Sequence, residues 1–108
     1  MNGENLAQST KLMAPKMKFT TVADYAVIPR TRYQPDLGNY ININPAYVMA
    51  VPTGEGDLDY PAFFKSLLKN NYQGVVSYEM CLPLRDGGDL KTLEKYAGTF
   101  LKYMEQFR

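Results

Sequence analysis

The stretch GEGDLDYPAFFKSLLKNNYQGVVSYEM, from Gly54 to Met80, decides the fold that the sequence predicts. A glycine-bearing turn leads to Asp59, a good helix N-cap, and to Pro61, which is tolerated in the first helical turn. Apolar residues then recur at helical spacing. The run GVVSYE, from Gly74 to Glu79, is nearly apolar, as in strands that are covered on both faces. The stretch therefore predicts a turn, a helix and a strand that ends on a carboxylate.

Working outward, the pattern of apolar residues, prolines and glycines predicts one domain over residues 1–108. We expect a helix at 5–14, a strand at 18–25, a long irregular loop at 26–51, a helix at 60–70, a strand at 74–79 and a last helix from 89 onward. The loop is expected because Pro29, Pro35, Gly38 and Pro45 interrupt any period. Alternation of strand, helix and strand predicts an α/β fold with a parallel sheet.

Two strands alone leave two sheet edges open and cannot bury both faces. A complete β/α barrel needs roughly 200 residues or more, so 108 residues cannot form one. We therefore predict that the chain is the C-terminal portion of a β/α (TIM) barrel, namely its last two strands and their helices. The expected partner is the missing N-terminal barrel portion, or a second copy through self-association.

Composition excludes several classes of function. The formal net charge is +1, which gives no electrostatic reason to expect nucleic acid as a partner. No apolar run approaches the roughly 20 residues of a membrane-spanning helix, so no membrane partner is expected. The single Cys81 excludes an internal disulfide, and the predicted location is cytoplasmic. With no histidine in the chain, neither a Ser/His nor a Cys/His catalytic pair can be built from it.

The candidate site residues are two carboxylates and three arginines. Glu79 and Asp24 each lie at the expected C-terminal end of a strand, where the active sites of β/α barrels are found. Carboxylate oxygens suit hard divalent cations and proton transfer. The alternatives are a rim-capping role for Glu79 and, for Asp24, acceptance of backbone hydrogen bonds in the following turn. Arg30, Arg32 and Arg85 are candidates to bind a sugar hydroxyl, a carboxylate or a phosphate, or are solvated loop charges.

From Gly3 to the C-terminus the chain resembles the closing part of the xylose isomerase-like barrel superfamily, the sugar phosphate isomerases and epimerases. The turn GEGDLDYPAFF, the strand end GVVSYEMC and the loop LRDGGDL carry the resemblance, together with the long last helix. The family motif YxGxxSxE is matched by Tyr72, Gly74, Ser77 and Glu79. In the preceding strand many members have His-x-Lys-Asp, where this chain has Thr21-Val22-Ala23-Asp24.

The resemblance implies a metal-dependent isomerase or epimerase of a small sugar or sugar phosphate. It implies a divalent metal (Mn²⁺, Mg²⁺, Co²⁺ or Zn²⁺) with Glu79 as ligand and as a catalytic group for proton transfer next to a carbonyl, through an enediolate. Asp24 is a second metal candidate, while Thr21 stands where the family has a metal-binding histidine. The alternatives are a non-catalytic sugar-binding barrel and an inactive truncated fragment.

Overall fold

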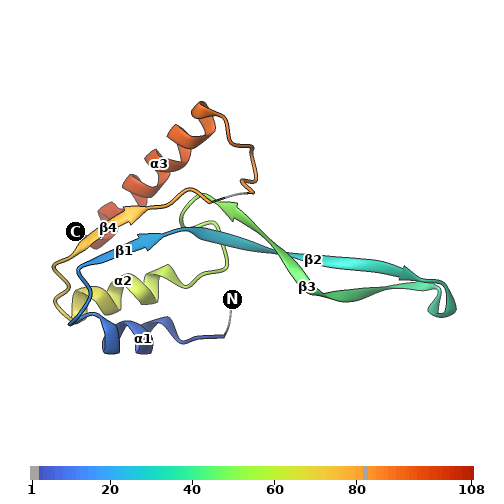
Figure 1. The fold of residues 1–108 in the computed structure, drawn as a ribbon, viewed down its shortest axis with the longest axis horizontal. Helices are drawn as coiled ribbons and strands as arrows, with labels where there is room; N and C mark the ends of the chain where they lie inside the picture. Colours follow the sequence, from blue (N-terminus) through green and yellow to red (C-terminus); the bar gives the residue numbers. More distant parts are fainter. Residues whose placement is uncertain (1–2, 82) are drawn as a thin grey trace.

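The computed structural model describes residues 3–81 and 83–108. In these residues, three α-helices and a parallel pair of strands form a body from which one long β-hairpin protrudes (Figure 1). Along the chain the elements are α1 (Leu6–Met13), β1 (Phe19–Val22), β2 (Asp24–Gln34), β3 (Asn39–Val51), α2 (Tyr60–Lys69), β4 (Val75–Tyr78) and α3 (Leu90–Met104), with 3₁₀ turns η1 (Pro35–Leu37) and η2 (Glu105–Phe107).

The three helices begin where the sequence predicts, each at a polar N-cap. The side chains of Asn5, Asp59 and Asp89 accept hydrogen bonds from backbone N–H groups three residues further on, at 3.0, 3.0 and 2.8 Å. These bonds satisfy donors that the first helical turn leaves without an intrahelical partner. The predicted helices are therefore confirmed, and capping side chains fix their starts.

Strands β1 and β4 pair in parallel, from Phe19 opposite Val75 to Val22 opposite Tyr78. The connection between them contains the hairpin and then α2, so the predicted strand–helix–strand unit with a parallel pair is confirmed. The pairing brings the C-terminal ends of both strands to the same end of the body.

The two faces of this parallel pair differ in what covers them. Val76 and Tyr78 pack against the core formed by α2 and α3, and the Tyr78 ring stacks on Phe100 with centroids 5.3 Å apart. On the opposite face, Phe19 and Val75 are 57% and 62% exposed. The helices thus cover one face only, and the face that Val75 shares with Glu79 is open to solvent.

The expected irregular loop at residues 26–51 is wrong, because the chain there forms the antiparallel strands β2 and β3. Their pairing runs from Asp24 opposite Val51 to Gln34 opposite Asn39. The sequence argument took each proline as a break in a strand, whereas the hairpin accommodates all of them.

The prolines of the hairpin lie where the ladder needs no N–H donor. Pro29 and Pro45 fall in the register shift that separates the inner and outer halves of the hairpin, so neither removes a ladder bond. Pro35 opens η1 at the turn, and Gly38 ends that turn in the left-handed conformation with φ of 57°.

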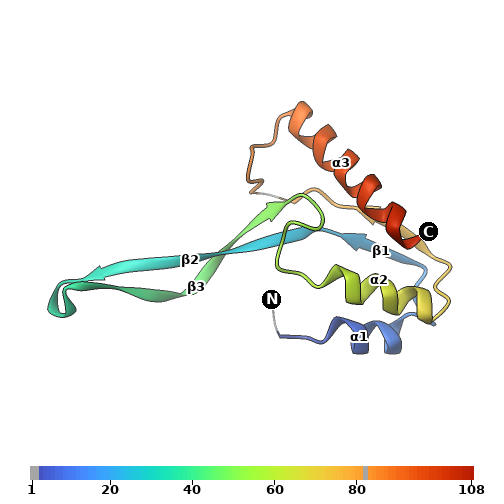
Figure 2. The ribbon, with the colours of Figure 1, turned by 180° about the vertical axis from the view of Figure 1, so that it is seen from behind.

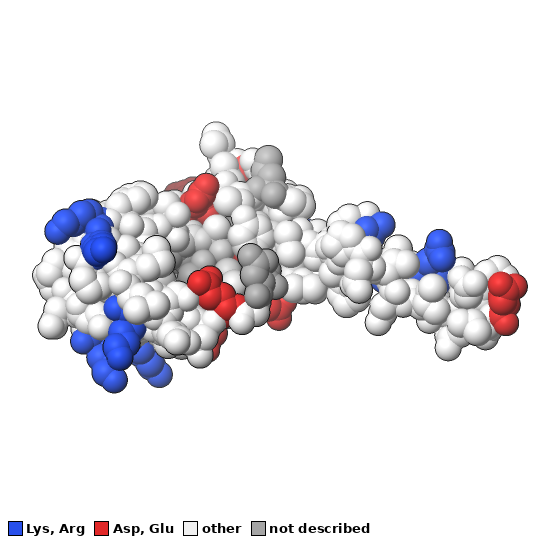
Figure 3. Space-filling view, turned by 60° about the horizontal axis from the view of Figure 1, so that its bottom comes forward, with Lys and Arg blue, Asp and Glu red and all other residues white. Residues whose placement is uncertain are grey.

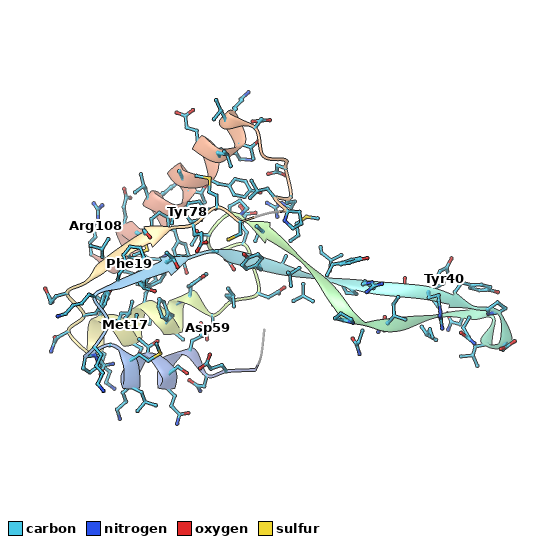
Figure 4. The ribbon with its side chains drawn as sticks, in the orientation of Figure 1. Met17, Phe19, Tyr40, Asp59, Tyr78 and Arg108 are labelled. Atoms are coloured by element: carbon cyan, nitrogen blue, oxygen red, sulfur yellow. The ribbon has the colours of Figure 1, made fainter. Side chains whose placement is uncertain are left out.

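The hairpin extends well beyond the body, as the view from behind also shows (Figure 2). Tyr40 lies near its far end (Figure 4). The molecule measures 57 × 35 × 20 Å, and its radius of gyration is 17.0 Å, whereas a compact domain of this size has about 13 Å. The main apolar core lies in the body, between the end of α1, the covered face of the sheet, α2 and α3.

The fold is therefore mixed α/β, as predicted at that level. The described residues form two separate two-stranded sheets and no closed barrel. Assignment of the chain to the end of a β/α barrel remains a prediction.

Candidate functional site

The candidate site lies at the C-terminal ends of β1 and β4. Strand β1 ends at Val22, earlier than predicted, and Asp24 begins β2 two residues later. The backbone N–H of Glu79 donates to the carbonyl oxygen of Val22 at 2.9 Å, so the ladder continues one step past Tyr78. Asp24 and Glu79 thus follow the ends of two neighbouring parallel strands.

Asp24 binds the glycine turn of its own chain. The side chain is 1% exposed, and its Oδ2 atom accepts hydrogen bonds from the N–H groups of Gly54 at 2.8 Å and Gly56 at 3.1 Å. Its Oδ1 atom accepts from the N–H of Tyr25 at 2.9 Å. Both oxygens therefore already have backbone donors, which is the turn-supporting alternative that the sequence allowed for this residue.

The geometry of the turn explains its glycines. A Cβ atom on Gly56 would collide with the Asp24 carboxylate and with the carbonyl oxygen of Tyr25. Gly54 has φ of 90°, and a Cβ atom there would lie 2.6 Å from Cε2 of Tyr103 in α3. The turn is thus held between the start of β2 and the last turn of α3.

A second set of hydrogen bonds holds the segment that joins β1 to β2. The hydroxyl of Tyr60, at the start of α2, donates to the carbonyl oxygen of Ala23 at 2.8 Å and accepts from the Ala23 N–H at 3.1 Å. Burial of Tyr60, together with the nearby charge of Asp24, raises the pKa of its hydroxyl to about 12, although the hydrogen bond from the Ala23 N–H acts in the opposite direction. The segment before Asp24 is therefore fixed by a neutral phenol.

Arg85 is brought to the same region by backbone pairing with β3. Its N–H donates to the carbonyl oxygen of Ala50 at 3.0 Å. Its guanidinium forms an ion pair with Glu55, the middle residue of the glycine turn, and its Nε atom lies 3.7 Å from Asp86. The bond to Glu55 is the main cause that raises the pKa of Arg85.

Glu79 is the one predicted site residue with an exposed carboxylate and no hydrogen bond to it from any described side chain. It lies close enough to Tyr25 for its charge to help raise the pKa of that hydroxyl. The larger cause is the thiol of Cys81 beside the Tyr25 hydroxyl, and the pKa of Tyr25 reaches about 12. Sequence reasoning did not identify Tyr25 and Cys81 as neighbours of the site.

Arg30 and Arg32 are not brought to the strand ends. They lie in the outer half of the hairpin, opposite Ile43 and Ile41, and Figure 3 shows positive side chains along the protruding arm. The Nη1 atom of Arg30 donates to the carbonyl oxygen of Pro45 at 3.2 Å, and its guanidinium lies 4.6 Å from the Tyr47 ring centroid. The sequence analysis placed both arginines in an irregular loop, which the chain does not form.

The carboxylates present fit only part of a divalent metal site. No group of three or more Asp, Glu or Cys side chains is placed to hold a metal ion within residues 3–81 and 83–108. Thr21 pairs with Ser77 in the parallel ladder. Glu79 can supply one oxygen ligand, whereas Asp24 has its oxygens engaged by backbone donors.

Comparison with models of known protein families, with curated proteins and with solved structures gives no match. Among the described helices, none combines the length and apolar character required to cross a bilayer. Sequence reasoning also missed Glu55 as a partner of Arg85. The available signal was the position of Glu55 between two glycines, which predicts a tight turn with the Glu55 side chain on its surface.

Proposed function

We propose that this chain carries part of the substrate mouth of a metal-dependent sugar isomerase or epimerase. The observation that supports the proposal most is the position of Asp24 and Glu79 after the ends of two parallel, adjacent strands. Enzymes built from β/α units bind and convert their substrates at that end of the sheet. The resemblance of the strand end and the glycine turn to xylose isomerase-like barrels points to the same chemistry.

In this proposal Glu79 is the residue that acts on the substrate. Isomerisation and epimerisation next to a carbonyl require a base that removes a proton from carbon and returns it. An exposed carboxylate at the strand end can do so, or can bind the divalent cation that stabilises negative charge on the substrate oxygen. Asp24 has a different role, because it holds the glycine turn and through that turn positions Glu55 and Arg85.

A second candidate is a sugar-binding protein without turnover. The observation that favours it is the incomplete metal set of the described residues, with Thr21 in place of the family's histidine. In this case the strand ends would recognise sugar hydroxyls and leave the carbon–hydrogen bond intact. Both candidates share the same surface and differ in whether a proton is exchanged.

Proton exchange and binding should be measured on the same samples. The purified protein would be incubated in D₂O with aldoses and ketoses and with Mn²⁺, Mg²⁺, Co²⁺ or Zn²⁺, and deuterium at the carbon next to the carbonyl would be followed by NMR. Calorimetry would report binding of the same sugars. Exchange that depends on a divalent cation supports the isomerase or epimerase. Binding without exchange supports the sugar-binding protein, and neither binding nor exchange by a protein that includes the expected N-terminal barrel portion rejects both.

A further inference from the structure

Two structural features that proteins use to bind phosphate are present at the candidate site. One is a glycine turn at a helix start whose backbone N–H groups converge, and the other is an arginine guanidinium. The turn contains Gly54 and Gly56 just before α2, and the guanidinium belongs to Arg85. By themselves these features would suggest a phosphorylated substrate.

The N–H groups of the turn and the guanidinium are already bound to carboxylates of the chain itself. The N–H groups of Gly54 and Gly56 donate to the buried Oδ2 atom of Asp24. The guanidinium of Arg85 is paired with Glu55, which lies on the same turn. A phosphate group would have to displace Asp24, which is 1% exposed, or separate Arg85 from Glu55.

The charge around Arg85 also gives an added anion little attraction. Arg85 is paired with Glu55, its Nε atom lies 3.7 Å from Asp86, and the Nζ atom of Lys95 lies 3.6 Å from the same carboxylate. The two carboxylates balance the two cations. A dianionic phosphate therefore meets no excess positive charge here, and a neutral polyhydroxyl compound needs none.

We propose that the site selects an unphosphorylated, neutral sugar, and that Glu55 determines this specificity by neutralising Arg85. That the ligand is a sugar rests on the proposed function, whereas the exclusion of phosphate rests only on the contacts described above. Arg85 keeps guanidinium N–H donors that Glu55 does not use, and these can donate to hydroxyl or carbonyl oxygens of a neutral ligand. Removing the charge of Glu55 should turn the same guanidinium into an anion-binding group.

Three probes would be titrated into the protein by calorimetry at constant ionic strength: inorganic phosphate, a ketohexose, and the same ketohexose esterified with phosphate at its terminal carbon. The variant is Glu55→Gln, which keeps the side-chain shape and removes the charge. Glu94→Gln, on the exposed surface of α3, is the matched control because it changes the net charge equally. The double change Glu55→Gln with Arg85→Gln tests whether any gained affinity passes through Arg85.

The unaltered protein should bind the ketohexose more tightly than its phosphate ester. Glu55→Gln should raise the affinity for inorganic phosphate and for the ester by about fivefold, as expected for an exposed ion pair worth about 1 kcal/mol. Affinity for the neutral ketohexose should not change, Glu94→Gln should have no effect, and adding Arg85→Gln should cancel the gain.

Tighter binding of the ester by the unaltered protein would overturn the inference, as would unchanged phosphate affinity in Glu55→Gln. If neither sugar binds but Glu55→Gln gains phosphate affinity that Arg85→Gln removes, the proposed function fails while the exclusion of phosphate holds. If the phosphate ester binds best and is converted to its isomer or epimer, the proposed function holds and the inference fails.

Discussion

The carboxylate of Asp24 accepts a hydrogen bond at 2.8 Å from the backbone N–H of Gly54, which lies 30 residues later in the chain. This bond crosses the base of the hairpin and joins the end of the β1 segment to the turn before α2. Because the turn carries Glu55, it also fixes the carboxylate that pairs with Arg85. Asp24 is therefore the link between the parallel pair and the charged residues of the candidate site.

Replacing Asp24 by asparagine should lower the free energy of unfolding by about 2–3 kcal/mol. The change removes a charged acceptor of backbone hydrogen bonds in a buried position, and such bonds are worth about 1.5–3 kcal/mol. Urea denaturation followed by circular dichroism would measure the loss. Asp36→Asn, on the exposed turn of the hairpin, serves as the control. Equal stability of the two variants would mean that the Asp24 bonds do not hold the turn.

Two glycine-to-alanine changes should have opposite effects on stability. Gly56→Ala places a Cβ atom against the Asp24 carboxylate and the Tyr25 carbonyl oxygen, so it should destabilise the protein. Gly98 lies within α3 and has no atom near its missing Cβ position, so Gly98→Ala should stabilise by roughly 0.5–1 kcal/mol. Thermal melts of both variants would check the signs. A neutral Gly56→Ala would show that the turn can move away from Asp24.

The hydroxyl of Tyr60 should make stability depend on alkaline pH. Its pKa is about 12 in the folded protein, against 10.0 for the free side chain, so the folded state binds the proton more tightly than the unfolded state. The resulting stabilisation is complete below pH 10 and is lost as the pH rises toward 12. Tyr60→Phe should cost about 1–2 kcal/mol at neutral pH and should show a smaller decline in this range. Denaturant titrations between pH 8 and about 12 would measure both quantities; identical declines would assign the titration to other tyrosines.

The open face of the parallel pair should cause association. Val75 and Phe19 are more than half exposed on that face, and the outer edges of a two-stranded sheet are unpaired. Sedimentation velocity should show mass that increases with protein concentration, and Val75→Lys should reduce it without loss of stability. Val76→Lys, on the covered face, should instead unfold the protein. A monomer with a cooperative melt at every concentration would contradict the expectation.

Local signals were sufficient to predict the body of the fold. Capping residues at Asp59 and Asp89 favour helix starts there, and the nearly apolar run after Gly74 predicts a strand. The hairpin could not be predicted in this way, since its prolines are tolerated only through a register shift that depends on the partner strand.

The candidate site could be predicted only in part, because local signals place single residues but not their distant partners. The position of Glu79 after β4 follows from the strand itself. The partners of Asp24 and Arg85 are Gly54, Gly56 and Glu55, each about 30 residues away, and no local pattern encodes contacts over that separation. Arg30 and Arg32 were misplaced because their position depends on the hairpin.

The most direct test of the proposed function is deuterium exchange in the Glu79→Gln variant. The variant keeps the shape of the side chain but removes the charge needed to accept a proton or bind a cation. With the sugar and the cation that give exchange in the unaltered protein, Glu79→Gln should lower the exchange rate by several orders of magnitude. Stability should change little, because Glu79 is exposed and no described side chain hydrogen-bonds to its carboxylate. Undiminished exchange in a folded Glu79→Gln protein would contradict the role assigned to this residue.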